Sequence, residues 1–283
     1  MKRYSILLCL VCVIGLVSSA IAQAPQSKAY PFQLSLVSPV SILSDSSSVN
    51  GLRIDIIYGA NENVTGIDFG LVNQANKDQK GLGLGIVNLV GGNVSGEQGG
   101  VVNFVAGNVT GAEWGGINLV GGNVTGLELG LLNYAGGNVS GSQGSIINWA
   151  GGNVTGLEIG GLNLVAGDMT GIEYGLLNWA GGKVAGGQAG WLNIANGMVD
   201  GAQGGLLNVA VEGANLQGAL INWAGKVDGA QIAVINIAED TTGMQLGGIN
   251  YTYKLSGLQI GVINIAWGKD SVWKVLPIVN ANW

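Results

Sequence analysis

The sequence lacks histidine, and its only two cysteines, Cys9 and Cys12, lie within the first 22 of its 283 residues. Once those residues are removed as a leader, the remaining chain carries neither imidazole nor thiol. Histidine-dependent acid–base catalysis, thiol nucleophiles, disulfides and Cys/His zinc sites are therefore excluded from it. We predict no enzymatic activity, no cofactor and no metal site.

Charged side chains are scarce as well. Asp, Glu, Lys and Arg together make up 10% of the residues, against about a quarter in an average domain. The net charge is −6, so the chain has no basic surface to hold phosphate groups, and nucleic-acid binding is excluded. A hydrophobic content of 47% also excludes ordinary disorder.

Residues 1–22 have the layout of a cleaved secretory signal. Lys2 and Arg3 precede an apolar run over residues 6–17, and the segment closes on small residues ending in Ala20-Ile21-Ala22. The apolar run is shorter than the roughly 20 residues that a membrane-spanning helix needs. A retained anchor or a lipid on either cysteine is the alternative. We predict a signal peptide at 1–22 and an exported protein.

Internal repetition dominates the rest of the chain. An asparagine recurs every fifteen residues from Asn73 to Asn208 and every fourteen from there to Asn264. The unit around it reads Gly-x-Glu/Gln-x-Gly-x-aliphatic-Asn, followed by a Gly-Gly-Asn-Val-Ser/Thr type of segment. We number positions from the first glycine, so that Gly126 is first and Asn133 is eighth in one unit. The period predicts an N-terminal β cap over 23–65, repeats over 66–266 and a C-terminal cap over 267–283.

This pattern predicts an all-β fold. Several glycines in each unit exclude helix, because one interior glycine costs about 1 kcal/mol relative to alanine, and the Gly-Gly-Asn segments are turn signals. The architecture we expect is a single-chain β-solenoid, in which each unit forms one coil and coils stack about 4.8 Å apart through parallel ladders. Equivalent asparagines then lie above one another as a ladder of amides. We expect the seventh, ninth and fourteenth positions to fill the interior. The predicted structural ladder comprises Asn88, Asn103, Asn118, Asn133, Asn148, Asn163, Asn178, Asn193 and Asn208.

An antiparallel transmembrane β-barrel is the alternative fold. Each unit is long enough to supply one tilted membrane strand of nine or ten residues, and the chain ends on an aromatic residue, Trp283. Two features weigh against a barrel. Neither alternating face of a unit is consistently apolar, since one carries Glu128 and the other Asn133. The turns also share one length, whereas barrels alternate short turns with long loops.

The third position carries acidic residues in several units. These are Asp68, Glu113, Glu128, Glu158 and Glu173. Paired carboxylates suit hydrolysis or calcium, but Gln98, Gln143 and Gln188 interrupt the series. Stacked carboxylates about 5 Å apart repel, and amides between them relieve the repulsion, so we interpret the series as structural. Calcium-binding coils also need regularly placed Asp ligands, which this chain lacks.

Three further surface patterns have both a structural and a functional interpretation. Six Asn-Val-Ser/Thr sequons begin at Asn63, Asn93, Asn108, Asn123, Asn138 and Asn153, and we interpret them as turn residues. A threonine row suited to ice or carbohydrate (Thr110, Thr125, Thr155 and Thr170) is interrupted by Ser95, Ser140 and Ala185. Trp149, Trp179 and Trp223 share the ninth position. They suit stacking on sugar rings, but we expect them to fill the core.

The units Gly257–Asn264 and Gly229–Asn236, the ending Leu276–Trp283 and the opening Phe32–Pro39 together resemble a family of exported bacterial surface-repeat proteins of undetermined function. The likeness covers nearly the whole mature chain. It implies a location in the bacterial envelope, in the periplasm, outer membrane or cell surface. We therefore expect a non-enzymatic structural or adhesin-like interaction protein with an unknown envelope or surface ligand. An outer-membrane barrel, acting as a pore, is the alternative.

Overall fold

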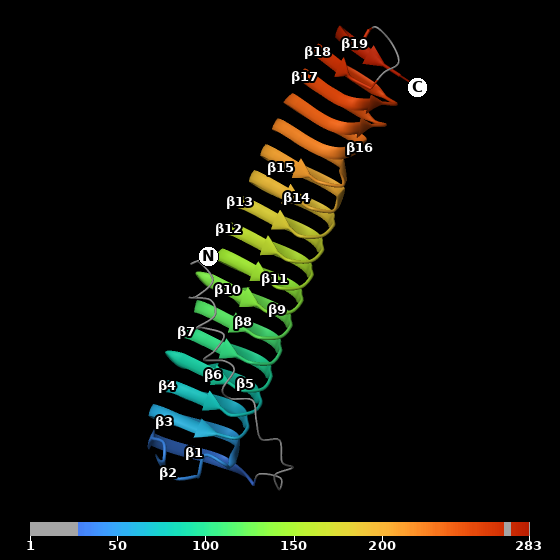
Figure 1. The fold of residues 1–283 in the computed structure, drawn as a ribbon. Coiled ribbons are helices and arrows are strands. Elements are labelled where there is room, and N and C mark those ends of the chain that lie inside the picture. The colour runs from blue at the N-terminus through green and yellow to red at the C-terminus, as the bar shows by residue number, and fades with distance from the viewer. Residues whose placement is uncertain (1–27, 269–272, 283) are drawn as a thin grey trace, which may run out of the picture.

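The computed structural model describes residues 28–268 and 273–282 as one elongated rod of stacked β-strands (Figure 1). The predicted signal peptide lies outside the described residues. No helix among the described residues has the length and apolar character needed to cross a membrane. The strands are β1 (Ala29–Val37), β2 (Val40–Ser41), β3 (Ser48–Asn61), β4 (Val64–Ala75), β5 (Gln79–Leu84), β6 (Val87–Val90), β7 (Val94–Val105), β8 (Val109–Val120), β9 (Val124–Leu129), β10 (Leu132–Ala135), β11 (Val139–Ala150), β12 (Val154–Val165), β13 (Met169–Ala180), β14 (Val184–Ala195), β15 (Met198–Ala210), β16 (Gly213–Thr241), β17 (Met244–Leu255), β18 (Leu258–Ala266) and β19 (Val275–Ala281).

The fold is a β-solenoid of about 16 turns, which confirms the predicted architecture. Consecutive coils pair in parallel and in register, so that each residue lies beside the residue fifteen places on, as Asn163 beside Asn178. From β15 onward the offset is fourteen. The antiparallel-barrel alternative is wrong, because parallel ladders join the successive coils and the only antiparallel pairs in the described chain, β1 with β2 and β18 with β19, lie at the two ends of the rod.

In the units from Gly51 to Gly186, the corner at the start of the unit depends on a first-position glycine with a positive φ. Gly126 has φ 136°, in the left-handed half of the backbone map where side chains other than hydrogen are strained. A Cβ atom there would lie 1.9 Å from the carbonyl oxygen of Gly111 in the preceding coil. The coil therefore bends at a point where neither the backbone angle nor the stacking distance leaves room for a side chain.

The interior is narrow and largely polar. Small aliphatic residues at the fourteenth position, such as Val139, and at the tenth, such as Ala135, are fully buried. The remaining inward positions are the third and the eighth, which hold Glu or Gln and Asn. The expectation for the fourteenth position is confirmed. The expectations for the seventh and ninth are wrong: Leu132 and Tyr134 lie half-buried on the outside.

The reason is a second corner within each unit. Side chains alternate inward and outward along a strand, yet the sixth and seventh residues both point outward, as Leu131 and Leu132 do. That corner shifts the alternation by one residue, so the eighth and tenth positions point inward and the ninth points outward. The tryptophans at the ninth position therefore do not fill the core. Trp149 is 41% exposed, and Trp179 and Trp223 are half-buried.

The ends of the rod differ from its middle. The segment predicted as an N-terminal cap contributes two further coils, since β1 pairs in parallel with β3 and β3 with β4. At the other end β19, within the predicted C-terminal cap, reverses direction and pairs with β18.

Candidate functional site

The two inward polar positions form two hydrogen-bonded columns that run along the rod. In the first column, each eighth-position asparagine donates from Nδ2 to Oδ1 of the asparagine in the next coil; Asn118 reaches Asn133 at 2.9 Å and Asn133 reaches Asn148 at 3.0 Å. The series is continuous from Asn73 to Asn264 and includes all nine asparagines of the predicted ladder. Nearly every member also donates to a backbone carbonyl oxygen of the next coil, as Asn118 does to Leu129. Apart from Oδ1 of Asn73, the first member of the column, these amides are therefore paired within the protein.

The second column consists of the third-position side chains. Gln203 donates from Nε2 to Oε1 of Gln188 at 2.7 Å, and the same bond repeats coil by coil to Gln259. Its donors point toward the N-terminus, opposite to those of the asparagine column. At the C-terminal end Asn280 of β19 donates to Gln259 at 3.3 Å, which closes the column.

The acidic members of this column are all buried. Glu113, Glu128, Glu158 and Glu173 each have 0% exposure. The glutamines separate them only in part, because Glu113 lies directly beside Glu128 and Glu158 beside Glu173 in the ladder. Each pair accepts one hydrogen bond from a glutamine side chain: Gln143 Nε2 donates to Glu128 Oε2, and Gln188 Nε2 donates to Glu173 Oε2. Two like carboxylates are thus stacked in a site without water contact, which strongly disfavours their charged forms.

The pKa values reflect this. Burial, followed by the neighbouring Glu128, raises the pKa of Glu113 to about 8, and burial with the neighbouring carboxyls raises that of Glu158 to about 8. Burial also raises the pKa of Glu128 and of Glu173 to about 7, although the hydrogen bond that each accepts from a glutamine lowers its pKa. These carboxyls therefore carry protons well into the neutral range.

Protonation also accounts for the polar atoms in and next to the glutamate pairs that lack partners. Both carboxyl oxygens of Glu113, Oε1 of Glu128 and Oε1 of Gln98 are buried without a hydrogen bond. When Glu128 is protonated, its O–H can donate to a carboxyl oxygen of Glu113. When Glu113 is protonated, its O–H can donate to Oε1 of Gln98. With these protons, each acidic side chain donates to the preceding coil, as the glutamines from Gln203 to Gln259 do. The second acidic pair, with Gln143 as its acceptor, has the same vacant oxygens.

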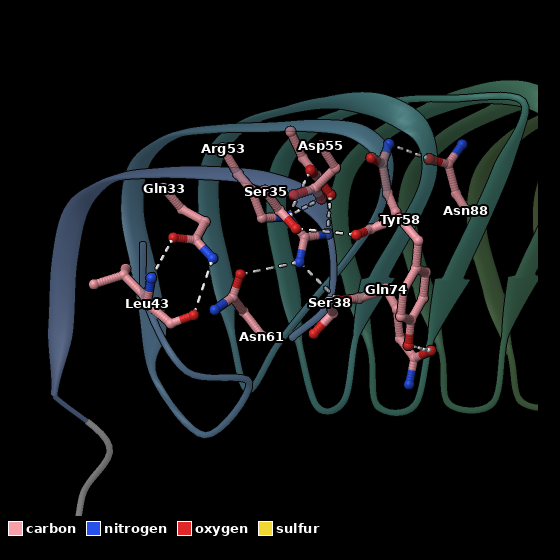
Figure 2. Close-up of polar contacts among 12 residues, drawn as sticks. Gln33, Ser35, Ser38, Leu43, Arg53, Asp55, Tyr58, Asn61, Gln74 and Asn88 are labelled. Atoms are coloured by element: carbon pink, nitrogen blue, oxygen red, sulfur yellow. Dashed lines mark hydrogen bonds and ion pairs between the residues drawn. The ribbon is translucent and has the colours of Figure 1, made fainter. Parts of the chain in front are cut away.

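A buried ion cluster lies in the N-terminal part of the column, one coil from Gln33 (Figure 2). Arg53, fully buried on β3, donates from Nε and Nη2 to the two carboxylate oxygens of Asp68 at 2.7 and 2.6 Å. Its Nε also lies 3.0 Å from Oδ2 of Asp55, and Nη1 donates to the Gln74 carbonyl oxygen at 2.7 Å. Burial raises the pKa of Asp55 to about 7 although Arg53 opposes this, and burial likewise raises the pKa of Asp68.

The sequence analysis missed Arg53 and Asp55. A signal for Arg53 exists, because fifteen residues before Asp68 is Arg53, which places it at the third position of an earlier coil. The structure confirms that register. A basic residue next to an acidic one in the same column is the arrangement that a buried carboxylate requires.

The turn residues form a third series on the outside. The backbone N–H of Asn123 donates to Oδ1 of Asn108 in the preceding coil at 2.7 Å, and the N–H of Asn138 to Asn123 in the same way. The turn position of the sequon asparagines is thus confirmed. Beside them the four threonines of the predicted row are exposed.

What these arrangements can do chemically is limited by access. The acidic side chains that sequence reasoning singled out are sealed inside the coil, so a substrate outside the rod has no contact with them. No group of three or more acidic, cysteine or histidine residues suited to a metal ion occurs in the described ranges. The surface open to partners consists of the turns and of the outward apolar positions.

Comparisons with known proteins add no further assignment. No protein-family model matches the sequence, and searches of curated proteins and of solved structures find no match.

Proposed function

We propose that the chain is a non-enzymatic structural or interaction protein of the bacterial cell envelope, exported by its leader and acting through its surface. One observation carries this proposal: the inward polar side chains are bonded in columns, while large apolar side chains cover the outside. Trp191, for example, is 66% exposed and Val262 73% exposed. Burying these exposed apolar side chains against a partner would stabilise a complex, and contiguous apolar patches on a protein surface mark binding sites.

The rod shape supports this role. Solenoids present extended surfaces, which suit a spacer or a scaffold that contacts a partner over many coils. The resemblance to exported surface-repeat proteins supports the envelope location.

The test is expression of the full chain in a Gram-negative host. We expect processing near Gln23, measured by intact mass, and recovery in the envelope or periplasmic fraction. Proteolysis of intact cells then distinguishes the surface from the periplasm. An unprocessed chain in the cytosol contradicts the location. Hydrolysis of any member of a glycan panel that is lost in Glu128→Gln contradicts the absence of catalysis.

A further inference from the structure

One side of the rod is apolar over its whole length. It is formed by the second, fourth and sixth positions of each unit, which we call the apolar face. Between Ile67 and Val262 the only charged residue on it is Glu97. Its exposed members include Phe69, Trp114, Leu131, Ile146, Tyr174 and Trp191. Soluble monomers rarely expose contiguous apolar patches beyond a few hundred Å², so this face requires a partner.

The apolar face is also uneven, and two of its hollows are not required by the coil. Gly204 and Gly218, both at the fourth position, have no atom within 4 Å of an added Cβ, and neither has a positive φ. At Gly144 an added Cβ meets only Cδ2 of Leu129, at 3.0 Å. Glycine weakens a strand interior and often marks close approach of another surface. Gly204 and Gly218 therefore leave space where a side chain would fit, and at Gly144 the flexible end of Leu129 would have to shift by a few tenths of an ångström.

The pattern of hollows and ridges at the fourth and sixth positions is self-complementary on either side of one coil, while in that coil Gly187 and Trp191 each face their own copies. Consider a second copy placed face to face and antiparallel, with a two-fold axis crossing the coil of Ala189 at right angles to the rod. Rotation about this axis brings each coil opposite the coil equally far on the other side of Ala189, with equivalent positions facing each other. Eleven coils, from that of Gly111 to that of Gly257, then lie opposite one another.

In this arrangement every fourth- or sixth-position glycine of the eleven coils faces a large apolar side chain of the second copy. One coil from the axis Tyr174 meets Gly204, and Trp191 lies on the axis facing its own copy. The remaining pairs are Gly218 with Ile159, Gly161 with Leu220, Gly144 with Ile232, Gly248 with Leu131 and Gly116 with Val262.

The area suits a stable dimer. Eleven coils at about 4.8 Å and a width of four residue steps at about 3.3 Å give roughly 700 Å² per copy, close to the roughly 800 Å² that each partner contributes to a standard interface. Charge favours the same partner. Within the eleven coils no second, fourth or sixth position is charged, and the acidic residues of the turns, such as Asp168 and Asp200, lie outside the apolar face. The net negative charge opposes binding to an anionic bilayer.

The ends of the rod are protected, which leaves the side for association. The terminal strands β1 and β19 carry Pro31 and Pro277, and proline on an edge strand blocks strand addition. The geometry points to an antiparallel homodimer that pairs through the apolar face about a two-fold axis at the coil of Ala189. This pairing deepens the interaction role proposed above and rests on it.

The test is the solution mass of the purified, processed chain, measured by sedimentation velocity over a concentration series. We expect twice the mass of one chain. Gly204→Tyr places a second tyrosine opposite Tyr174 at two sites per dimer. Because overpacking costs about 1–3 kcal/mol per site, we expect the dissociation constant to rise about 30-fold or more.

Two further variants make the result specific. The exchange Tyr174→Gly with Gly204→Tyr swaps ridge and hollow, and we expect it to restore dimerisation. Val209→Trp is the matched control, since it adds a large ring to the same coil at the ninth position, where neighbouring Trp223 already shows that tryptophan fits. We expect it to leave the mass unchanged. Circular dichroism confirms that each variant keeps its β-structure.

Three results overturn the pairing: a monomer for the unaltered chain, a dimer insensitive to Gly204→Tyr, or flotation with neutral phosphatidylcholine vesicles in place of dimerisation. None of them bears on export, which the fractionation experiment measures separately.

Discussion

The buried acidic pairs make the stability of the rod dependent on pH. In the unfolded chain the four glutamates lose their protons near pH 4.5, whereas in the folded chain Glu113 and Glu158 keep theirs to about pH 8, and Glu128 and Glu173 to about pH 7. Between these limits the folded state binds more protons than the unfolded state. The stability that these four groups contribute is therefore fully present below about pH 4.5 and is lost as pH rises to about 7–8.

The size of the effect follows from the same values. Each tenfold difference in proton affinity is worth about 1.4 kcal/mol, so each glutamate costs the fold about 3–5 kcal/mol at alkaline pH relative to acid pH. The four together give a loss on the order of 15 kcal/mol. Replacing all four by glutamine gives the uniform amide column already present from Gln188 to Gln259, and glutamine does not titrate.

The assay is the guanidinium midpoint, followed by circular dichroism, at intervals between pH 4.5 and pH 9. We expect the unaltered chain to lose stability steadily over this range. The fourfold Glu→Gln variant should match or exceed it at pH 4.5 and be much more stable at pH 8. A slope about as large as that of one glutamate should remain, because the pKa of Asp55 is also raised to about 7. The exposed Glu212→Gln is the control and should not change the profile. Identical profiles for the unaltered and fourfold chains, or carboxyl carbon shifts of ionised glutamates at pH 6, would refute the reasoning.

Three other substitutions test separate parts of the fold by the same unfolding measurement. Asn148→Ala interrupts the asparagine column and leaves the buried Asn133 amide without its acceptor, so we expect a loss of about 2–4 kcal/mol, whereas an unchanged midpoint would show that the column contributes little. Gly126→Ala places a Cβ against a backbone oxygen at a positive φ and should destabilise by more than 1 kcal/mol; its control Thr125→Ala, at the exposed neighbouring position outside the apolar face, should change stability by less than about 0.5 kcal/mol. Arg53→Met leaves two buried carboxyls without their cation and should cost about 3–5 kcal/mol, with faster amide exchange confined to the first coils; uniform exchange along the rod would contradict that local role.

Much of this fold can be predicted from the period alone. A repeat of fifteen with glycine at fixed positions excludes helix and brings equivalent residues together, so the stacking of Asn133 on Asn148 follows once coils are assumed. The same register, extended upstream, pairs Arg53 with Asp68. These predictions succeed because in-register stacking depends only on the number of residues per coil.

The inside and outside of the coil are harder to predict. Continuous alternation along a unit places the seventh and ninth residues inside, but the corner at Leu131 and Leu132 turns two successive side chains outward. The hydrophobicity of the residues does not reveal this corner, because apolar residues occupy the outward positions while the polar Glu128 and Asn133 point inward. The interior is polar because column bonds satisfy amides at each coil, a property of the stack and not of any single unit.

The central claim is that residues fifteen apart lie one coil apart along a rod. Pairs of spin labels at turn positions test it directly, using cysteines introduced at residues 63 and 153, six coils apart, and at residues 93 and 153, four coils apart, in chains diluted with unlabelled protein. The solenoid predicts distances of about 29 Å and about 19 Å, in proportion to the number of coils at about 4.8 Å each. Distances that do not scale with the number of intervening repeats would contradict it.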